Sequence, residues 1–69
     1  MSEHTYAVTE LVGSSKKSIE DAIQGAVKTA AASLRNLEWL EVTQVRGHIE
    51  DGVVDYYQVM LKVGFRYEK

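Results

Sequence analysis

A helical stripe of apolar residues occupies the second quarter of the chain. The stripe recurs at intervals of three and four, which is the spacing of one helix face, through Ile19, Ala22, Ile23, Ala26, Val27, Ala30 and Leu34. Ser18 followed by Asp21 resembles a capping box. The pattern therefore predicts a helix that begins near Ser15 or Ser18 and ends near Asn36. Gly25 within it is expected to allow close packing on a sheet.

Before the helix, residues Thr5 to Val12 mix β-branched and aromatic side chains with alanine and leucine, a composition typical of a strand. Alternation is imperfect, so both faces of this strand are partly apolar. We expect both to be covered. Gly13-Ser14-Ser15 is predicted to end the strand.

Two longer strands are predicted after the helix, from Trp39 to His48 and from Val53 to Tyr67. Asp51-Gly52 between them is a strong signal for a two-residue hairpin turn. Regular pairing from that turn sets Trp39 opposite Gly64, together with the pairs Thr43–Met60 and Val45–Gln58.

In this register the hairpin has one apolar and one mixed face. The apolar face carries Leu40, Val42, Tyr57, Val59, Leu61, Val63 and Phe65; the mixed face carries Trp39, Glu41, Thr43, Val45, Gln58, Met60, Lys62 and Arg66. The apolar face should cover the helix. The fold class expected for residues 1–69 is a single α+β domain of order β-α-β-β, in which one helix packs on one face of a three-stranded antiparallel sheet. The first strand could pair with either later strand.

Composition changes this picture by pointing to self-association. A chain of 69 residues buries only a small core, and such domains usually need disulfides, a metal or oligomerisation. The chain has no cysteine, and its two histidines, His4 and His48, lack metal-ligand spacing. Neither a thiolate site nor another metal site is therefore predicted. Oligomerisation through the uncovered mixed face is the remaining means of stabilisation.

Charge and hydropathy limit the classes of partner that the protein can have. The net charge of −2 and the pI near 5.6 argue against nucleic acid. No apolar run approaches the ~18 residues of a membrane span, and the polar start Met1-Ser2-Glu3-His4 lacks a hydrophobic signal region. We expect a cytoplasmic protein that does not bind or span a membrane.

The candidate chemistry lies on the mixed face. Trp39, the only tryptophan in the chain, offers a flat electron-rich surface for stacking. Gln58 offers a hydrogen-bond donor beside an acceptor. If the two strands form a hairpin, both groups can face one flat heterocycle. No nucleophile–base pair or pair of helical carboxylates indicates catalysis, so a binding protein is favoured over an enzyme.

The whole pattern resembles the dodecin family of small flavin-binding proteins, in particular its bacterial branch. The resemblance rests on segments spread over nearly the whole chain: Gly13-Ser14-Ser15, Glu20-Asp21-Ala22-Ile23, Asn36-Leu37-Glu38-Trp39-Leu40-Glu41-Val42, Arg46-Gly47-His48, Asp51-Gly52, Tyr57-Gln58-Val59 and Lys62-Val63-Gly64-Phe65-Arg66. The tryptophan segment and the glutamine strand together are the most specific part.

The resemblance implies a hollow homododecamer whose flavins bind in pairs between subunits. It assigns stacking on the ring to Trp39 and a bond to the pyrimidine edge to Gln58. FMN is the flavin expected, with riboflavin or FAD as alternatives, and coenzyme A is a further ligand of some members. The FMN phosphate needs a cation. Arg46 is the first candidate, although simple alternation puts it on the face opposite Trp39; Arg66 and Lys62 share the face of Trp39.

The function expected from this resemblance is flavin storage and buffering, with photoprotective quenching of the bound flavin by the indole. Two alternatives stay open. One is a small FMN-dependent redox enzyme, and the other is a structural oligomer that binds coenzyme A or no ligand.

Overall fold

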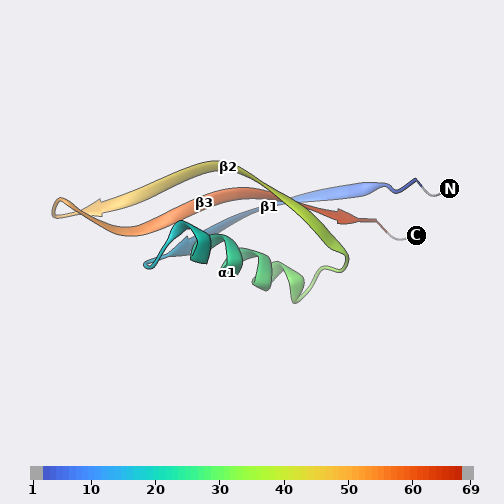
Figure 1. Cartoon of the computed structure of the whole chain (residues 1–69), viewed down its shortest axis with the longest axis horizontal. Coiled ribbons are helices and arrows are strands. Elements are labelled where there is room, and N and C mark those ends of the chain that lie inside the picture. Colours follow the sequence, from blue (N-terminus) through green and yellow to red (C-terminus); the bar gives the residue numbers. More distant parts are fainter. Residues whose placement is uncertain (1–2, 68–69) are drawn as a thin grey trace.

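The computed structural model describes residues 3–67 and has the element order β-α-β-β predicted from the sequence. Strand β1 (Tyr6–Ser15) precedes helix α1 (Ile19–Ala31), and strands β2 (Leu37–Glu50) and β3 (Val53–Arg66) form a long hairpin (Figure 1). The sheet is antiparallel with the order β1-β3-β2. The choice that the sequence left open is thus settled: β1 pairs with β3, which becomes the central strand.

The hairpin turn is the predicted one. Asp51 and Gly52 have φ values of 54° and 77°, and two central residues with positive φ are the mark of a tight turn whose twist suits a β-hairpin. The Trp39–Gly64 pair is also as predicted.

Between the turn and the Trp39–Gly64 pair, two bulges shift the register of the hairpin. Asp55 is an extra residue in β3, and Thr43 is an extra residue in β2, so residues 44–48 pair one position away from regular alternation. Val45 pairs with Val59, and Gln44 takes the place predicted for Thr43, opposite Met60. The predicted pairs Val45–Gln58 and Thr43–Met60 were therefore wrong, because bulges insert one residue into a single strand and move its neighbours to the other face.

Helix α1 begins where its capping residues place it. The Ser18 hydroxyl accepts a bond of 2.9 Å from the Asp21 backbone N–H, and the Ser15 hydroxyl donates one of 2.7 Å to the Asp21 carboxylate. Glu20 and Asp21 complement the positive end of the helix dipole. The helix ends at Ala31, earlier than predicted, and Asn36 has a left-handed φ of 63° as the chain turns into β2.

Strand β1 extends to Ser15, three residues beyond the predicted end at Val12. The Gly13-Ser14-Ser15 segment pairs with β3 and forms the last three residues of the strand, which therefore ends within this segment and not before it. Gly13 is where the helix approaches most closely, since a Cβ there would overlap the Ala22 carbonyl oxygen and lie 3.0 Å from Ala26 Cβ. Gly25, expected to allow this approach, is exposed and has nothing within 4 Å of an added Cβ.

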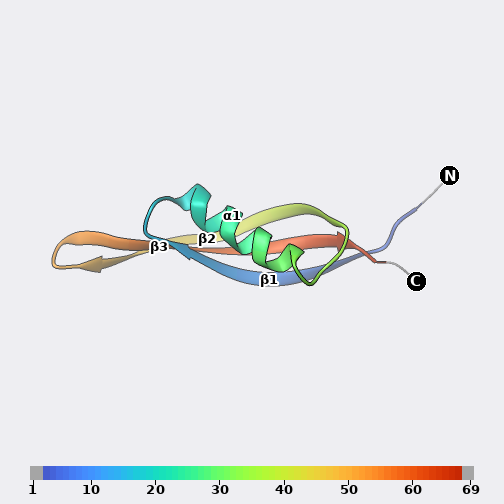
Figure 2. The ribbon, with the colours of Figure 1, turned by 90° about the horizontal axis from the view of Figure 1, so that it is seen from below.

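The core lies between α1 and the central strand. Its buried side chains are those of Ala22, Val59, Leu61 and Val63. Full burial of a side chain such as Leu61 is worth roughly 1.5–3 kcal/mol. Helix α1 covers β1 and β3 (Figures 1 and 2), so the predicted packing of one helix on one sheet face is confirmed.

Helix α1 leaves most of strand β2 uncovered. Every residue from Glu38 to Glu50 is exposed, including Leu40, Val42 and Val45 on the helix side. The chain is elongated, 55 × 20 × 14 Å, and the tip of the β2–β3 hairpin projects well beyond the helix (Figure 1). Exposed apolar side chains gathered along one strand are typical of an interaction surface.

Candidate functional site

The open face of the sheet carries the candidate binding residues. Residues that pair across a ladder share a face, and the register places on this face Tyr6, Val8, Glu10, Val12 and Ser14 of β1, Trp39, Glu41, Gln44, Arg46 and His48 of β2, and Tyr56, Gln58, Met60, Lys62, Gly64 and Arg66 of β3. The open face therefore carries all four predicted site residues: Trp39, Gln58, Arg46 and Arg66.

Trp39 is seated on Gly64. A Cβ at Gly64 would overlap the indole atoms Cε2, Cζ2 and Nε1, so the ring lies over the backbone of the central strand. Gly64 is buried, whereas the tryptophan is 43% exposed. The indole thus has one side against the sheet and surface left free for a flat partner.

Gln58 lies on the same face but in a different place. It is half-buried on β3, six residues before Gly64, which corresponds to about 20 Å along a strand. This spacing exceeds the length of a three-ring heterocycle. Trp39 lies this far from Gln58 because it pairs with Gly64 and not with a residue near Gln58. The expectation that both side chains face the same flat ring stays a prediction.

The two residues define two half-sites, one at each end of the open face. The half-site around Gln58 borders a hollow of about 360 Å³ that Ser14 and Tyr56 also line. Trp39 borders a smaller hollow of about 170 Å³ at the edge of β2, where Leu37, Leu40 and Val63 line the helix side. Val27 of α1 also lines this hollow, so it lies on the helix side and is not part of the open-face half-site of Trp39.

Arg46 belongs to the half-site of Gln58. It pairs directly with Gln58 because the extra residue Asp55 moves it onto the face of Trp39, contrary to simple alternation. Its Nη2 donates to Gln44 Oε1 at 2.6 Å and lies 3.5 Å from Met60 Sδ. An exposed guanidinium next to an amide is suited to bind an anion.

The bulge residue Thr43 is tied to the central strand. Its hydroxyl donates to the Met60 carbonyl at 3.1 Å. This bond fixes the point at which β2 returns to the register of Trp39. The hydrogen bond thus stabilises the bulge. Along β2 the bulge lies between the two half-sites.

Arg66 belongs to the half-site of Trp39. Its Nη1 lies 4.0 Å from Glu38 Oε2, and the Tyr6 hydroxyl donates to Glu38 Oε1 at 3.1 Å. That hydrogen bond raises the pKa of Tyr6 above its usual value of 10.0 because it favours the protonated phenol, and the Glu38 charge acts in the same direction. Sequence reasoning missed Tyr6 and Glu38; the alternation of β1 puts Tyr6 on the open face, but its pairing with Arg66 depends on the strand order.

Lys62, the third predicted cation, lies between two carboxylates. It pairs with Glu10 on one side and with Glu41 on the other. Opposite charges that face each other across a ladder attract one another weakly. Of the three predicted cations, the two arginines are the better candidates for a phosphate, because a guanidinium can donate two parallel hydrogen bonds to it.

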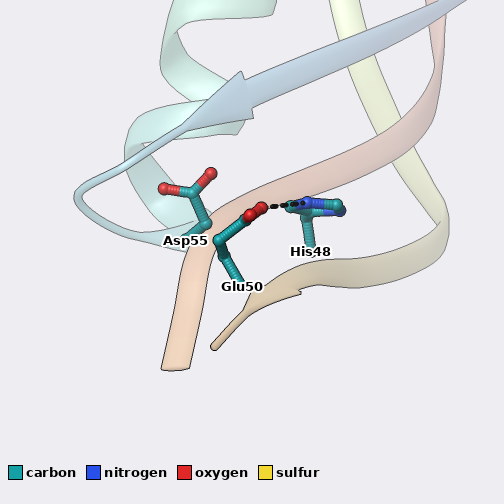
Figure 3. Close-up of side chains that lie close together, drawn as sticks. All are labelled: His48, Glu50 and Asp55. Carbon is teal, nitrogen blue, oxygen red and sulfur yellow. Dashed lines mark hydrogen bonds and ion pairs between the residues drawn. The ribbon is translucent and has the colours of Figure 1, made fainter. Parts of the chain in front are cut away.

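A group of polar side chains near the hairpin turn was also missed. His48 Nε2 lies 3.2 Å from Glu50 Oε1, and the His48 ring stacks on Tyr56 at 5.1 Å. Asp55, the extra residue of β3, completes a group whose ligand atoms lie within 4.8 Å of one another (Figure 3). Such a group could hold a metal ion, although Asp55 also pairs with Lys16 at 3.5 Å. Spacing along the chain concealed it because Asp55 comes from the opposite strand.

Comparison with known proteins decides the family. The model of the family described as dodecin matches residues 5–68. This chain belongs to the dodecin family. It is 48% identical over 64 residues to the dodecin of Thermus thermophilus, covering 93% of each sequence.

Solved dodecin structures have the same fold. The structure of dodecin from Streptomyces coelicolor superposes with a TM-score of 0.94 at 56% identity, covering 100% of this chain and 99% of that one. A more distant structure is calcium dodecin from Mycobacterium tuberculosis, described as calcium-chelating and as having a novel calcium-binding site; its TM-score is 0.80 at 26% identity, with 93% of this chain and 91% of that chain covered. The fold and the family inferred from the sequence are thus confirmed.

Within residues 3–67 no helix is long and apolar enough to cross a membrane.

Proposed function

We propose that this protein binds FMN between copies of itself and serves to store and buffer the flavin. The observation that carries the proposal is the seat of Trp39 on Gly64, which leaves indole surface free for a flat ring. Stacking on an aromatic side chain contributes roughly 1–3 kcal/mol for a nucleic-acid base, and an isoalloxazine presents a comparable flat surface.

The half-site of Gln58 supplies the polar contacts that FMN needs. The Gln58 amide can donate to and accept from the pyrimidine edge of the ring. Arg46 beside it and Arg66 near Trp39 are the cations proposed for the phosphate. Riboflavin and FAD share the ring and are weaker proposals, because neither presents a terminal phosphate to these arginines. Coenzyme A, which the resemblance to the dodecin family implies, is proposed as a further ligand.

The separation of about 20 Å between the half-sites along one strand supports a site that two copies complete. One copy contributes Trp39 and another contributes Gln58. The bare apolar side of β2 supports the same conclusion, since Leu40, Val42 and Val45 are covered only if another chain packs on them. A closed homododecamer is the assembly proposed.

A binding protein is favoured over a redox enzyme. In the proposed role the indole of Trp39 donates an electron to the photoexcited ring and rapidly regains it, which dissipates light energy. An enzyme would instead need an open ring edge and a site for a reductant. Turnover of reduced nicotinamide by the FMN-loaded protein would support the enzyme alternative. The cytoplasmic localisation expected from the sequence stays a prediction.

The decisive experiment is an absorption spectrum of the purified protein, combined with mass spectrometry of whatever denaturation releases. We expect a flavin spectrum and the mass of FMN. Light scattering after size exclusion should give a single large oligomer. A colourless protein that takes up no FMN, riboflavin or FAD would support the purely structural oligomer, and a monomer at micromolar concentration would contradict the shared site.

A second candidate function is the binding of a divalent cation. It rests on the His48, Glu50 and Asp55 group and on the calcium-chelating relative. One imidazole with two carboxylates suits Zn²⁺ better than Ca²⁺, which prefers oxygen ligands. Calorimetric titration of the parent and of His48→Ala with each ion tests this function, and equal heats for both proteins would contradict it.

A further inference from the structure

Gly64 differs from the other strand glycines in what it touches. A side-chain methyl there would overlap three atoms of the Trp39 indole, whereas a methyl on Gly47 would lie 3.5 Å from Val54 Cγ1, at ordinary contact distance. The three atoms nearest to a Cβ at Gly64 all belong to the indole. The missing side chain therefore creates the seat in which the indole lies.

Backbone conformation does not explain why glycine is present at this position. The left-handed glycine of the chain is Gly52, with φ of 77°, and Gly64 lies outside that region. Alanine could adopt the same backbone there without strain.

Core packing does not explain it either. Gly64 pairs with Val8 on one side and with Trp39 on the other, both on the open face. A Cβ at Gly64 would point to that face, away from the helix and from the core on the other side of the sheet. The main consequence of adding a methyl is thus the displacement of the indole.

We infer that Gly64 is the positioning residue of the ring-binding site: it lets the Trp39 indole lie close to the sheet and so fixes the height and orientation of the surface on which the flavin ring stacks. The inference rests on the proposed function for the identity of the ligand. Any side chain at position 64 lifts or rotates the indole. It then stands where the ligand ring would lie.

The test compares Gly64→Ala with Gly47→Ala, which adds the same methyl to another strand glycine. FMN titration should give a dissociation constant for Gly64→Ala that is raised about 5- to 150-fold, the factor that corresponds to stacking on one aromatic ring. Gly47→Ala should keep the parental constant. Without any flavin, the emission of the single tryptophan and its quenching by acrylamide should change in Gly64→Ala only.

A double-mutant cycle separates positioning from a general effect. In the Trp39→Ala background, adding Gly64→Ala should alter FMN affinity less than about twofold, because the methyl has no indole to displace. An equal loss in both backgrounds would overturn the inference, as would parental affinity and tryptophan emission in Gly64→Ala. If Gly64→Ala fails to fold, recovery of folding in the double variant supports the inference, and continued failure overturns it.

The failure of the proposed function is recognised separately. If the parent protein binds no flavin, the FMN titrations are all flat and the proposed function is wrong. The tryptophan emission of the flavin-free variants still decides whether Gly64 positions the indole.

Discussion

Arg46 lies directly across from Gln58 in the β2–β3 ladder. Regular counting from the Asp51-Gly52 turn would put Val45 there and send the arginine to the helix side. The bulge residue Asp55 advances the register, and Thr43 restores it before Trp39. These two extra residues place a guanidinium next to an amide on the open face.

We predict that Arg46→Ala weakens binding of FMN but not of riboflavin. A hydrogen bond to a charged group contributes about 1.5–3 kcal/mol. Riboflavin has no phosphate, so the loss of the arginine should not affect its binding. Arg66→Ala should act in the same direction and less strongly, because Glu38 already lies 4.0 Å from Arg66. Lys62→Ala is the control. Equal losses for both flavins would show that the arginine holds the ring or the assembly.

Trp39→Ala should reduce FMN affinity by about 1–3 kcal/mol while the oligomer survives. The side chain is 43% exposed, so its removal opens no deep cavity. Deletion of a large core side chain would instead cost about 3–5 kcal/mol of stability. Thermal melting and FMN titration of one sample distinguish these results, and a dissociated oligomer would identify Trp39 as a packing residue.

Bound FMN should be almost non-fluorescent, and Trp39→Phe should restore much of its emission. Phenylalanine keeps a flat face but is a poor electron donor, and the chain has no second tryptophan. Emission is measured for FMN in buffer, with the parent and with the variant, at protein concentrations that force occupancy. If both proteins quench alike, another group is responsible.

Ser18→Ala should destabilise the fold by about 0.5–2 kcal/mol because the Asp21 N–H loses its capping oxygen. Ser33→Ala, just past the helix, is the control for the loss of a serine hydroxyl. Denaturant unfolding measures both, and equal midpoints would show that the cap is dispensable.

The Tyr6–Glu38 hydrogen bond makes a pH-dependent contribution to stability. Since the pKa of Tyr6 is raised in the folded protein, this contribution is present below the ordinary tyrosine pKa of about 10 and is lost as the pH rises through the raised value. In Glu38→Gln the pKa of Tyr6 should fall. Alkaline absorbance titration of each protein against its Tyr6→Phe counterpart isolates this phenol, and identical curves would refute the assignment.

Local signals in the sequence predicted the elements and the turn well. Ser18 and Asp21 marked the start of the helix, and Asp51-Gly52 fixed both ends of the hairpin register. Nothing in the alternation of residues 39–48 signalled the bulge at Thr43, because a threonine fits a regular strand equally well. The faces of Val45 and Arg46 were reversed for this reason.

The composition of the site was easier to predict than its geometry. Trp39 and Gln58 were correctly placed on one face. Their separation along β3 follows from the predicted register, and contact of both with one ring stays a prediction. The predicted register already set Gly64 opposite Trp39, but nothing in the sequence indicated that the indole lies directly over this glycine.

The presence of two half-sites at opposite ends of one face allows subunits to repair one another. If each binding site takes its indole from one chain and its amide from another, a Trp39→Ala chain still carries an intact Gln58, and a Gln58→Ala chain still carries an intact Trp39. Assemblies reconstituted from a mixture of the two variants would then contain some sites in which both half-sites are unmutated. Neither variant alone could form such a site, so flavin uptake by the mixture would exceed that of either variant by itself, as in complementation between two alleles.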